Sequence, residues 1–468
     1  MGQSFHRRPV YQNESEVGLM VDSTYDSRNV IRSEGQGAGL DSLDLLLAVI
    51  AEYEGLEYLI EVEKVTRIES YFVKKQLEIN RSVDVTHIHL TVYNVFSEGE
   101  KRFRGSSLAE IHPGMTFGEM KEAIDEALYA AGFVRNEYYP LVEVCDAKET
   151  EGRGEHDLYS ALEKLVQAVY AEDHHDKGYL SYSEFFIEKK DVRLLNSNGV
   201  DQTYTNYSTN VETAVNWVDG KEIEISEQYT MAGFDANLLG RRVAKLFDVA
   251  SKKPLAQMTS AVKDINILLT GECLSQFFGY YYNNANAASV YNKVSTFSVG
   301  DALQGAASGD KISMRLDPFL EGSTGSKPYD KDGLPLDTVE LIRDGVLCRY
   351  WGDVRNSSYL DISPTGSIGN YVVNGGTKPI AEMKARPYLE LVSFSAFDVD
   401  NVTGDFASEI RLGFYFDGNE TVAVTGGSVS GNIKKIHGNM RMSLERVQFN
   451  NYEGPLTVCV RGVAIAGQ

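Results

Sequence analysis

The sequence predicts an α+β fold rich in antiparallel β-structure, with a smaller N-terminal helix-and-sheet domain and a larger, β-rich C-terminal domain. Helical patterns cluster between residues 41 and 250, whereas the Gly-rich chain after residue 254 is dominated by short strand patterns. This segregation argues against alternating βαβ units. The 27 Tyr and 20 Phe residues also favour strands, because aromatic side chains fit a pleated, half-buried surface.

The residue pattern in the first third of the chain predicts one helix followed by several strands. Residues 1–35 are polar and end in a Gly-rich run, which predicts an extension with little packing of its own. Residues 41–53 place Leu43, Leu46 and Ile50 on one helical face. Residues 57–96 then alternate apolar and polar positions, as in a half-buried antiparallel sheet. His87 and His89 fall on one face of a strand there; without a third ligand nearby, a polar strand face is favoured over a metal site.

The middle of the chain predicts further helices and a hairpin. Thr116 and Glu119 have capping-box spacing before a run of good helix formers. Residues 157–172 form a third amphipathic helix, and residues 237–250 a fourth. Between them, Asn196 to Gly199 join two strands as a hairpin turn, because Asn and Gly tolerate positive φ.

Four segments follow from these patterns. They are an N-terminal extension (1–35), an N-terminal α/β domain (36–115), a central helix and strand region (116–232) and a β-rich C-terminal domain (233–468).

Composition excludes several classes of protein. The 45 basic and 67 acidic residues give 45 − 67 = −22, which opposes direct binding to nucleic acid. No apolar run approaches the ~18 residues of a membrane span, and no signal peptide is evident. The cysteines are scattered without a CxxC pair, which fits a reducing, cytoplasmic location; they are Cys145, Cys273, Cys348 and Cys459.

Familiar catalytic and binding motifs are absent or incomplete. Residues 173–184 have EF-hand spacing, but His175 and Lys177 stand where oxygen ligands belong, so an exposed helix–strand turn is the better interpretation. Residues 35–39 match neither a dinucleotide fingerprint nor a P-loop. Residues 427–431 lack the order of a nucleophile elbow, and no HExxH occurs.

Several stretches taken together resemble the TldD/PmbA family, the "modulator of DNA gyrase" metallopeptidases. Gly404-Asp405-Phe406 is followed by TVAVTGGSVSGNIKKIHGNM and by GPLTVCVRGVAIAG, like the C-terminal run of that family. KPYDKDGLPLDTVELIRDGVL resembles the family's Asp-x-x-Gly loop, and LLNSNGV its central Asn-Ser-x-Gly hairpin. The matching turn residues are Asn196, Gly199, Asp330, Gly333, Gly404, Asp405, Gly431 and Asn432. The resemblance covers roughly residues 190–467.

The resemblance also implies where a zinc site would lie. Active members are similar to zinc peptidases with His-Glu-x-x-Gly-His on a helix, in which two His bind the metal and the Glu acts as general base. A Cys in the C-terminal Gly-rich turn supplies a third ligand. The matching segment here is SQFFGY, so Ser275 and Tyr280 replace the two His, Gln276 replaces the Glu, and Gly279 remains. Val429 or Ser430 stands at the Cys position.

This pattern is that of the PmbA/TldE-like branch, which resembles a non-metal-binding partner of TldD. We therefore expect a subunit without catalytic residues, bound metal or cofactor of its own, which completes a TldD-type peptidase acting on unfolded or extended peptides. Its expected partner is a zinc-bearing paralogue or a second copy of the chain. Two alternatives stay open: a self-sufficient peptidase with unidentified ligands, and a non-catalytic peptide-binding homodimer that holds peptide at its sheet edges. The sequence alone does not say whether Tyr280 to Tyr282 line a cleft or the core.

Overall fold

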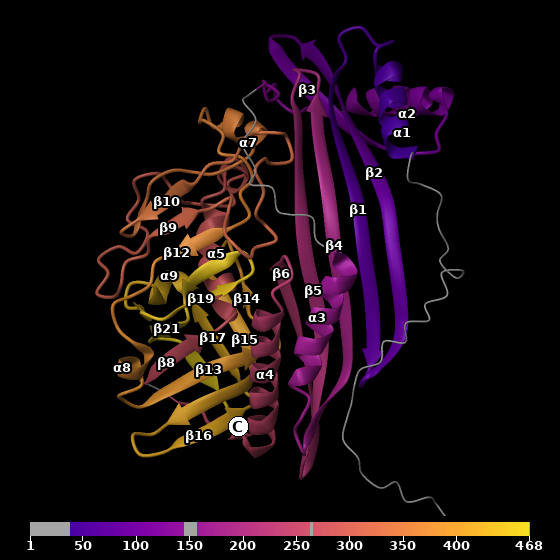
Figure 1. Cartoon of the computed structure of the whole chain (residues 1–468). Coiled ribbons are helices and arrows are strands. Elements are labelled where there is room, and N and C mark those ends of the chain that lie inside the picture. The colour runs from indigo at the N-terminus through magenta and orange to yellow at the C-terminus, as the bar shows by residue number, and fades with distance from the viewer. Residues whose placement is uncertain (1–37, 145–156, 263–264, 468) are drawn as a thin grey trace, which may run out of the picture.

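The computed structural model describes residues 38–144, 157–262 and 265–467, and it has the predicted α+β fold. One long antiparallel sheet with its helices forms one side of the molecule, and two further sheets around a central helix form the other (Figure 1). In the described part of the chain, no helix is both long and apolar enough to cross a membrane. The expected extension, residues 1–35, lies outside the described residues.

The long sheet has six antiparallel strands in the order β3-β2-β1-β4-β5-β6. Residues 57–96, expected to hold several strands, form one long hairpin, because their alternation continues with only a short turn after Val73. The hairpin at Asn196 to Gly199 is confirmed, with φ of +86° at Gly199. The strands are β1 (Glu57–Val73), β2 (Gln76–Glu98), β3 (Lys101–Ile111), β4 (Gly178–Asn196), β5 (Asp201–Asp219) and β6 (Lys221–Ala232).

Four helices cover one face of this sheet. α1 (Ala38–Ile50) and α2 (Phe117–Ala131) pack on its upper part, and α3 (Leu158–Ala171) and α4 (Ala236–Lys252) on its lower part (Figure 1). Both bonds of the predicted capping box are present: the Glu119 amide donates to Thr116 Oγ1, and the Thr116 amide donates to Glu119 Oε2. Asp157 and Asp235 cap α3 and α4. Of the EF-hand-like segment, residues 173–177 form the predicted turn between α3 and β4, and residues 178–184 are the start of β4.

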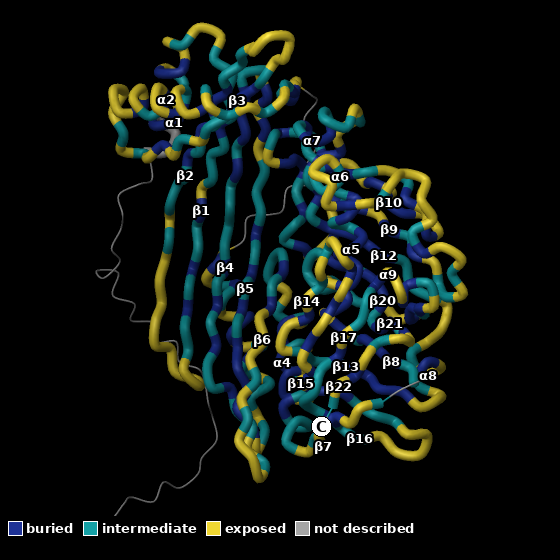
Figure 2. The backbone as a smooth tube through the Cα atoms, turned by 180° about the vertical axis from the view of Figure 1, so that it is seen from behind, coloured by how far each residue is buried: buried dark blue, intermediate teal, exposed yellow. Residues whose placement is uncertain are grey.

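The remainder of the chain forms two mixed sheets around α5 (Cys273–Asn284). One has the order β11-β10-β9-β12-β20-β19, and the other follows β18-β21-β8-β13-β15-β16-β7, with β14, β17 and β22 attached beside β15. Most pairings are antiparallel as expected, but β8–β13, β12–β20 and β7–β16 are parallel. A single large apolar core lies between the sheets, dark blue in Figure 2.

Most elements of this part are short. The helical ones are η2 (Lys253–Leu255), α6 (Ala287–Tyr291), α7 (Val354–Tyr359), α8 (Ile380–Met383) and α9 (Ile433–Ile436). The strands of the first sheet are β9 (Met314–Leu316), β10 (Val339–Arg343), β11 (Val346–Leu347), β12 (Tyr371–Val373), β19 (Arg446–Phe449) and β20 (Tyr452–Pro455). Those of the second are β7 (Gln257–Met258), β8 (Asn266–Thr270), β13 (Tyr388–Phe394), β14 (Asp398–Val399), β15 (Asp405–Phe416), β16 (Thr421–Thr425), β17 (Ser428–Asn432), β18 (Arg441–Met442), β21 (Thr457–Val460) and β22 (Ala464–Ala466).

The expected segment boundaries differ from the packing at two places. The expected boundary between residues 115 and 116 does not divide two sheets, because β1–β3 and β4–β6 belong to the same sheet. The expected start of the C-terminal domain at 233 precedes α4, whose buried residues Leu239, Val243 and Phe247 pack on the long sheet. The C-terminal core therefore begins after α4.

Candidate functional site

The segment at which the resemblance places a zinc site is the central helix of the C-terminal core. β8 ends at Thr270, and Gly271, with φ of +97°, turns the chain into α5. The inner face of α5 is buried, through Cys273, Leu274, Phe277, Phe278, Gly279, Tyr280, Tyr281 and Asn284. Ser275 is half-buried and Gln276 is exposed. The helix thus turns Ser275 and Gln276 outward and Tyr280 inward.

The polar atoms of Ser275 and Tyr280 make different contacts. Ser275 Oγ donates to the Glu272 carbonyl at 2.8 Å, within its own helix. The Tyr280 side chain is 1% exposed, and its ring packs edge-on against Phe297 and Tyr281. Its hydroxyl has no hydrogen-bond partner among the described residues, and burial raises its pKa to about 12. Tyr280 and Tyr281 are therefore core aromatics, which answers the question that the sequence left open for them.

Gly279 lies in an uninterrupted stretch of α-helix. A methyl group in place of its hydrogen would lie 3.7 Å from Tyr371 Oη and 4.0 Å from Asn283 Nδ2, which are ordinary contact distances. The packing of this chain therefore does not require glycine at this position.

The C-terminal signature residues come together beside α5. Asp405 and Phe406 at the start of β15 pair with Asn432 and Gly431 of β17. Asn432 Nδ2 donates to Asp405 Oδ1 at 2.7 Å, and this hydrogen bond lowers the pKa of Asp405. The ring of Phe406 contacts Phe277 of α5, and a Cβ on Gly404 would lie 3.5 Å from the Tyr280 ring. The residues that carry the C-terminal part of the resemblance therefore lie together in the folded chain, next to α5.

The two candidates for the third ligand position point in opposite directions. Val429 is fully buried in the C-terminal core, and Ser430, the next residue of β17, is exposed. A valine side chain has no donor atom for a metal.

These residues do not fit a zinc ion. Protonated Ser and Tyr hydroxyls and a Gln amide are poor ligands for zinc, which takes thiolate, imidazole or carboxylate. Across residues 38–144, 157–262 and 265–467, no three His, Cys, Asp or Glu side chains are grouped closely enough to hold a metal ion. We therefore derive no step through a metal in this chain.

A cluster of charged side chains that the sequence did not indicate lies at the N-terminus of α5. Glu272 there interacts with Glu227 of β6 and with Arg242 and Lys245 of α4. The Glu272 side chain is partly exposed, but the protein atoms around its carboxylate remove part of its hydration. This desolvation and the negative charge of Glu227 raise the pKa of Glu272. These residues come from β6, α4 and the start of α5, which only the folded chain brings together, so no spacing pattern could have identified them.

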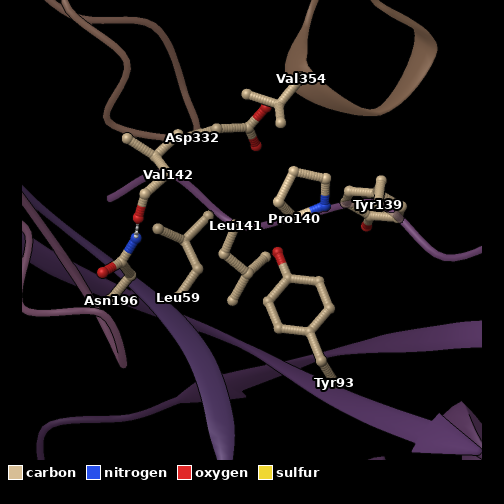
Figure 3. A pocket seen from close by; sticks show the side chains of 9 residues that line it. All are labelled: Leu59, Tyr93, Tyr139, Pro140, Leu141, Val142, Asn196, Asp332 and Val354. Atoms are coloured by element: carbon tan, nitrogen blue, oxygen red, sulfur yellow. Dashed lines mark hydrogen bonds between the residues drawn. The ribbon is translucent and has the colours of Figure 1, made fainter. Parts of the chain in front are cut away.

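The other two signature turns meet at the junction between the long sheet and the C-terminal domain. A Cβ on Gly333, whose φ is +83°, would lie 2.9 Å from Val200 Cγ1, directly after the Asn196 to Gly199 hairpin. A small cavity of about 20 Å³ lies beside them, room for about one water molecule. Figure 3 shows Asn196 donating to the Val142 carbonyl (2.8 Å) at its edge, with Asp332 and Tyr93 also lining it.

Asp330 holds the loop of the second turn. It is 1% exposed, and its Oδ1 accepts from the amides of Asp332 and Leu334, both at 2.9 Å. Burial and the nearby Asp332 raise its pKa to about 6. These signature residues therefore stabilise the junction between the long sheet and the C-terminal domain. Their contacts described above do not involve α5.

Comparisons with known proteins agree with this architecture. Residues 262–467 match the model of the PmbA/TldA metallopeptidase C-terminal domain. The chain is 21% identical to the Metalloprotease PmbA homolog of Buchnera aphidicola, over 75% of this chain and 80% of that protein. Its fold is similar to that of TldE from Thermococcus kodakarensis, with a TM-score of 0.73 at 15% identity over 91% and 99% of the two chains. A candidate modulator of a DNA gyrase from Thermotoga maritima matches with the same score and identity, over 91% and 100%.

Proposed function

We propose that this chain, whose residues 262–467 belong to the PmbA/TldA metallopeptidase C-terminal family, is a catalytically silent PmbA/TldE-like subunit of a TldD-type metallopeptidase. The observation that supports the proposal is the donor set on α5: the resemblance places Ser275, Gln276 and Tyr280 at the positions of the two His and the Glu, and none of the three is a good zinc ligand or general base. Extended or unfolded peptides are the proposed substrates of the complete enzyme.

The chemistry of these side chains explains why the chain would be silent alone. A general base must take up a proton, and the Gln276 amide does not do so near neutral pH. The Ser275 hydroxyl is already engaged with the Glu272 carbonyl, and the Tyr280 hydroxyl is buried with a raised pKa. The chain would then contribute structure to the complex, and a zinc-bearing paralogue would contribute the chemistry.

The test measures zinc and peptidase activity on the same preparation. After exposure to zinc and gel filtration, we expect the purified chain to retain far less than one zinc per chain and to leave an unfolded protein such as reduced casein uncleaved. Addition of a zinc-bearing TldD-type protein should give a complex whose activity exceeds that of either component. Stoichiometric zinc with chelator-sensitive cleavage by this chain alone would overturn the proposal and favour a self-sufficient peptidase.

A further inference from the structure

Among the described residues, no helix covers the lower part of one face of the long sheet. The four helices pack on the face that carries Ile68, Phe185 and Val211. Figure 2 looks onto the opposite face, where β1, β2, β4 and β5 run in view with no helix in front of them. The loop around Tyr329 covers only the upper end of this face, where it packs on Val192 and Leu194.

The lower part of the open face is acidic. We define the acidic sheet face by six residues of β1, β4, β5 and β6 that the register places on this side: Tyr71, Tyr182, Glu184, Glu212, Glu222 and Glu224. Glu184 lies directly opposite Glu212 in the β4–β5 pairing. Two like charges in such a cross-strand position repel each other and destabilise a sheet.

No cation within the described residues neutralises these carboxylates by an ion pair. Their hydrogen bonds come from neutral donors: Tyr182 Oη to Glu212 at 2.7 Å, Ser181 Oγ to Glu224 at 2.9 Å and Asn216 Nδ2 to Glu222 at 3.0 Å. Higher on the same face, by contrast, Glu63 pairs with Lys190, and Glu69 and Glu188 pair with Arg67. Lys74 is near the lower end, but its ammonium group lies 5.2 Å over the ring of Tyr179.

An independent observation indicates that a donor is missing here. Asn216 is 8% exposed, and its Oδ1 has no hydrogen-bond partner in the described structure. A buried acceptor that stays unpaired costs free energy unless a partner arrives. Because its amide nitrogen is already bound to Glu222, the free oxygen lies beside carboxylates and can accept from a cationic donor.

The geometry points to a basic polypeptide segment as the occupant. A second copy of this face would bring acidic side chains against acidic ones, so self-association here is disfavoured. Side chains on one face of a strand repeat every ~6.6 Å, and an extended polypeptide presents alternate side chains at the same interval. Lys or Arg at alternate positions could therefore match the carboxylates, and the Tyr71 and Tyr182 rings could contact the cations.

We propose that the acidic sheet face binds an extended polypeptide segment rich in Lys and Arg. This goes beyond the proposed function, because the surface lies on the long sheet and needs neither α5 nor a zinc-bearing partner. Binding by the isolated chain and cleavage by a complex are separate measurements, so either proposal can fail while the other stands.

The experiment is fluorescence anisotropy with the full-length chain and a fluorescein-labelled peptide in which Arg and Ser alternate over about a dozen residues. The first variant is Glu184→Gln/Glu212→Gln, and Glu224→Gln is a second, single change on the same face. The control is Glu122→Gln/Glu126→Gln on the exposed side of α2, which removes the same two charges. At about 0.15 M salt, we expect the first variant to weaken binding at least tenfold. The control should change it less than twofold, and the first variant should unfold at no lower temperature than the unmodified chain.

Four results would overturn the proposal. One is no binding of the Arg-Ser peptide under these conditions. Another is equal weakening by the sheet-face and α2 variants, which would show attraction to net charge alone. The third is full competition by spermine at equal charge concentration, which would assign the face to small polyamines. A Gln-Ser peptide of equal length should not bind, and its binding would exclude charge recognition.

Discussion

At the scale of single residues, Gly279 offers a test of what this chain still requires at the α5 site. Glycine inside a helix is less favourable than alanine by roughly 0.5–1 kcal/mol. A methyl group at residue 279 would make only ordinary contacts, with Tyr371 Oη 3.7 Å away. We expect Gly279→Ala to stabilise the C-terminal domain by about 0.5–1 kcal/mol. Urea unfolding followed by Trp351 fluorescence in a Trp217→Phe background measures this.

The matched control is Gly431→Ala on β17. A Cβ there would lie 2.6 Å from Phe406 Cζ and 2.9 Å from Val463 Cγ1, too close without movement of the core. This variant should lower stability by about 1–3 kcal/mol, the usual cost of overpacking. Destabilisation by Gly279→Ala of similar size would show that the glycine on α5 is needed after all.

The carboxyl group of Asp330 should make the stability of the C-terminal domain depend on pH. Its pKa is raised from 3.8 to about 6 in the folded protein, so the folded state holds the proton more tightly than the unfolded state. The protonated form therefore contributes stability that is present below pH 4 and lost as pH rises through 6. A shift of this size corresponds to at most about 3 kcal/mol. Thermal unfolding between pH 4 and pH 7 should show this dependence, and it should be flatter in Asp330→Asn.

Asp400 supplies a control of opposite sign. Its carboxylate accepts from the amides of Val402 and Thr403, and these hydrogen bonds lower its pKa. A lowered pKa contributes stability that is lost as pH falls, so Asp400→Asn should reduce stability more at pH 7 than at pH 3. An Asp330→Asn variant with the same pH trend as the unmodified chain would contradict the assignment.

Individual site residues could be located from the sequence only through the family resemblance. It placed Ser275, Gln276 and Tyr280 on one helix, but it did not indicate that Tyr280 would be buried, because burial depends on Phe297 and other distant contacts. The charged cluster around Glu272 and the unpaired Asn216 Oδ1 have no local sequence signal. Both arise from neighbours that only the folded chain brings together.

At the scale of elements, the capping box of α2 is an isolated and measurable contribution. Thr116 satisfies the Glu119 amide, and Glu119 in turn satisfies the Thr116 amide. Thr116→Ala removes the first bond and should lower stability by about 1 kcal/mol. Hydrogen exchange should show faster exchange in the first turn of α2. Glu122→Ala, at an exposed position of the same helix, should change neither quantity measurably.

Elements with strong local signals could be predicted, and those set by long-range contacts could not. Local sequence signals predict the four helices before residue 253 and the hairpin at Asn196. These signals are hydrophobic periodicity, helix-capping residues and turn residues. The parallel pairs β8–β13 and β7–β16 join segments more than 100 residues apart, and no local pattern specifies them. The same holds for the continuity of β1–β3 with β4–β6 in one sheet.

At the scale of the whole molecule, the long sheet and the C-terminal domain meet at the junction shown in Figure 3. We expect this junction to couple the unfolding of the two parts. Val142, Val200 and Val354 form a small apolar cluster there, and Tyr359 Oη donates to the Glu137 carbonyl at 3.0 Å. Val354→Asp buries an unpaired charge, which should cost roughly 3 kcal/mol or more. We expect the unfolding transitions reported by Trp217 and Trp351 to coincide in the unmodified chain and to separate in Val354→Asp. Val402→Asp, at an exposed residue, should leave them together.

One surface of the C-terminal domain is a candidate contact site for a partner subunit. We expect the turn Gly426 to Asn432 to contribute to a subunit interface, and the structure shows which of its residues can test this. Gly426 and Gly427 have φ of +73°, and Gly431 packs on Phe406, so substitutions there would disturb the fold. Ser430 is exposed on β17, between Ala407 of β15 and Ala464 of β22, where a long charged side chain adds bulk without changing the backbone.

If the chain forms a homodimer or a complex with a zinc-bearing paralogue through this turn, we expect Ser430→Arg to prevent that assembly, with the mass measured by light scattering. A stable interface buries at least ~1,000 Å², and a desolvated charge near its centre is hard to accommodate. The control is Gln167→Arg on the exposed side of α3, which adds the same charge far from this surface. An unchanged mass for Ser430→Arg, together with dissociation by Gln167→Arg, would place the interface on the long-sheet side. The helices that cover that sheet would then be the partner-binding elements, and the C-terminal turns would serve the fold alone.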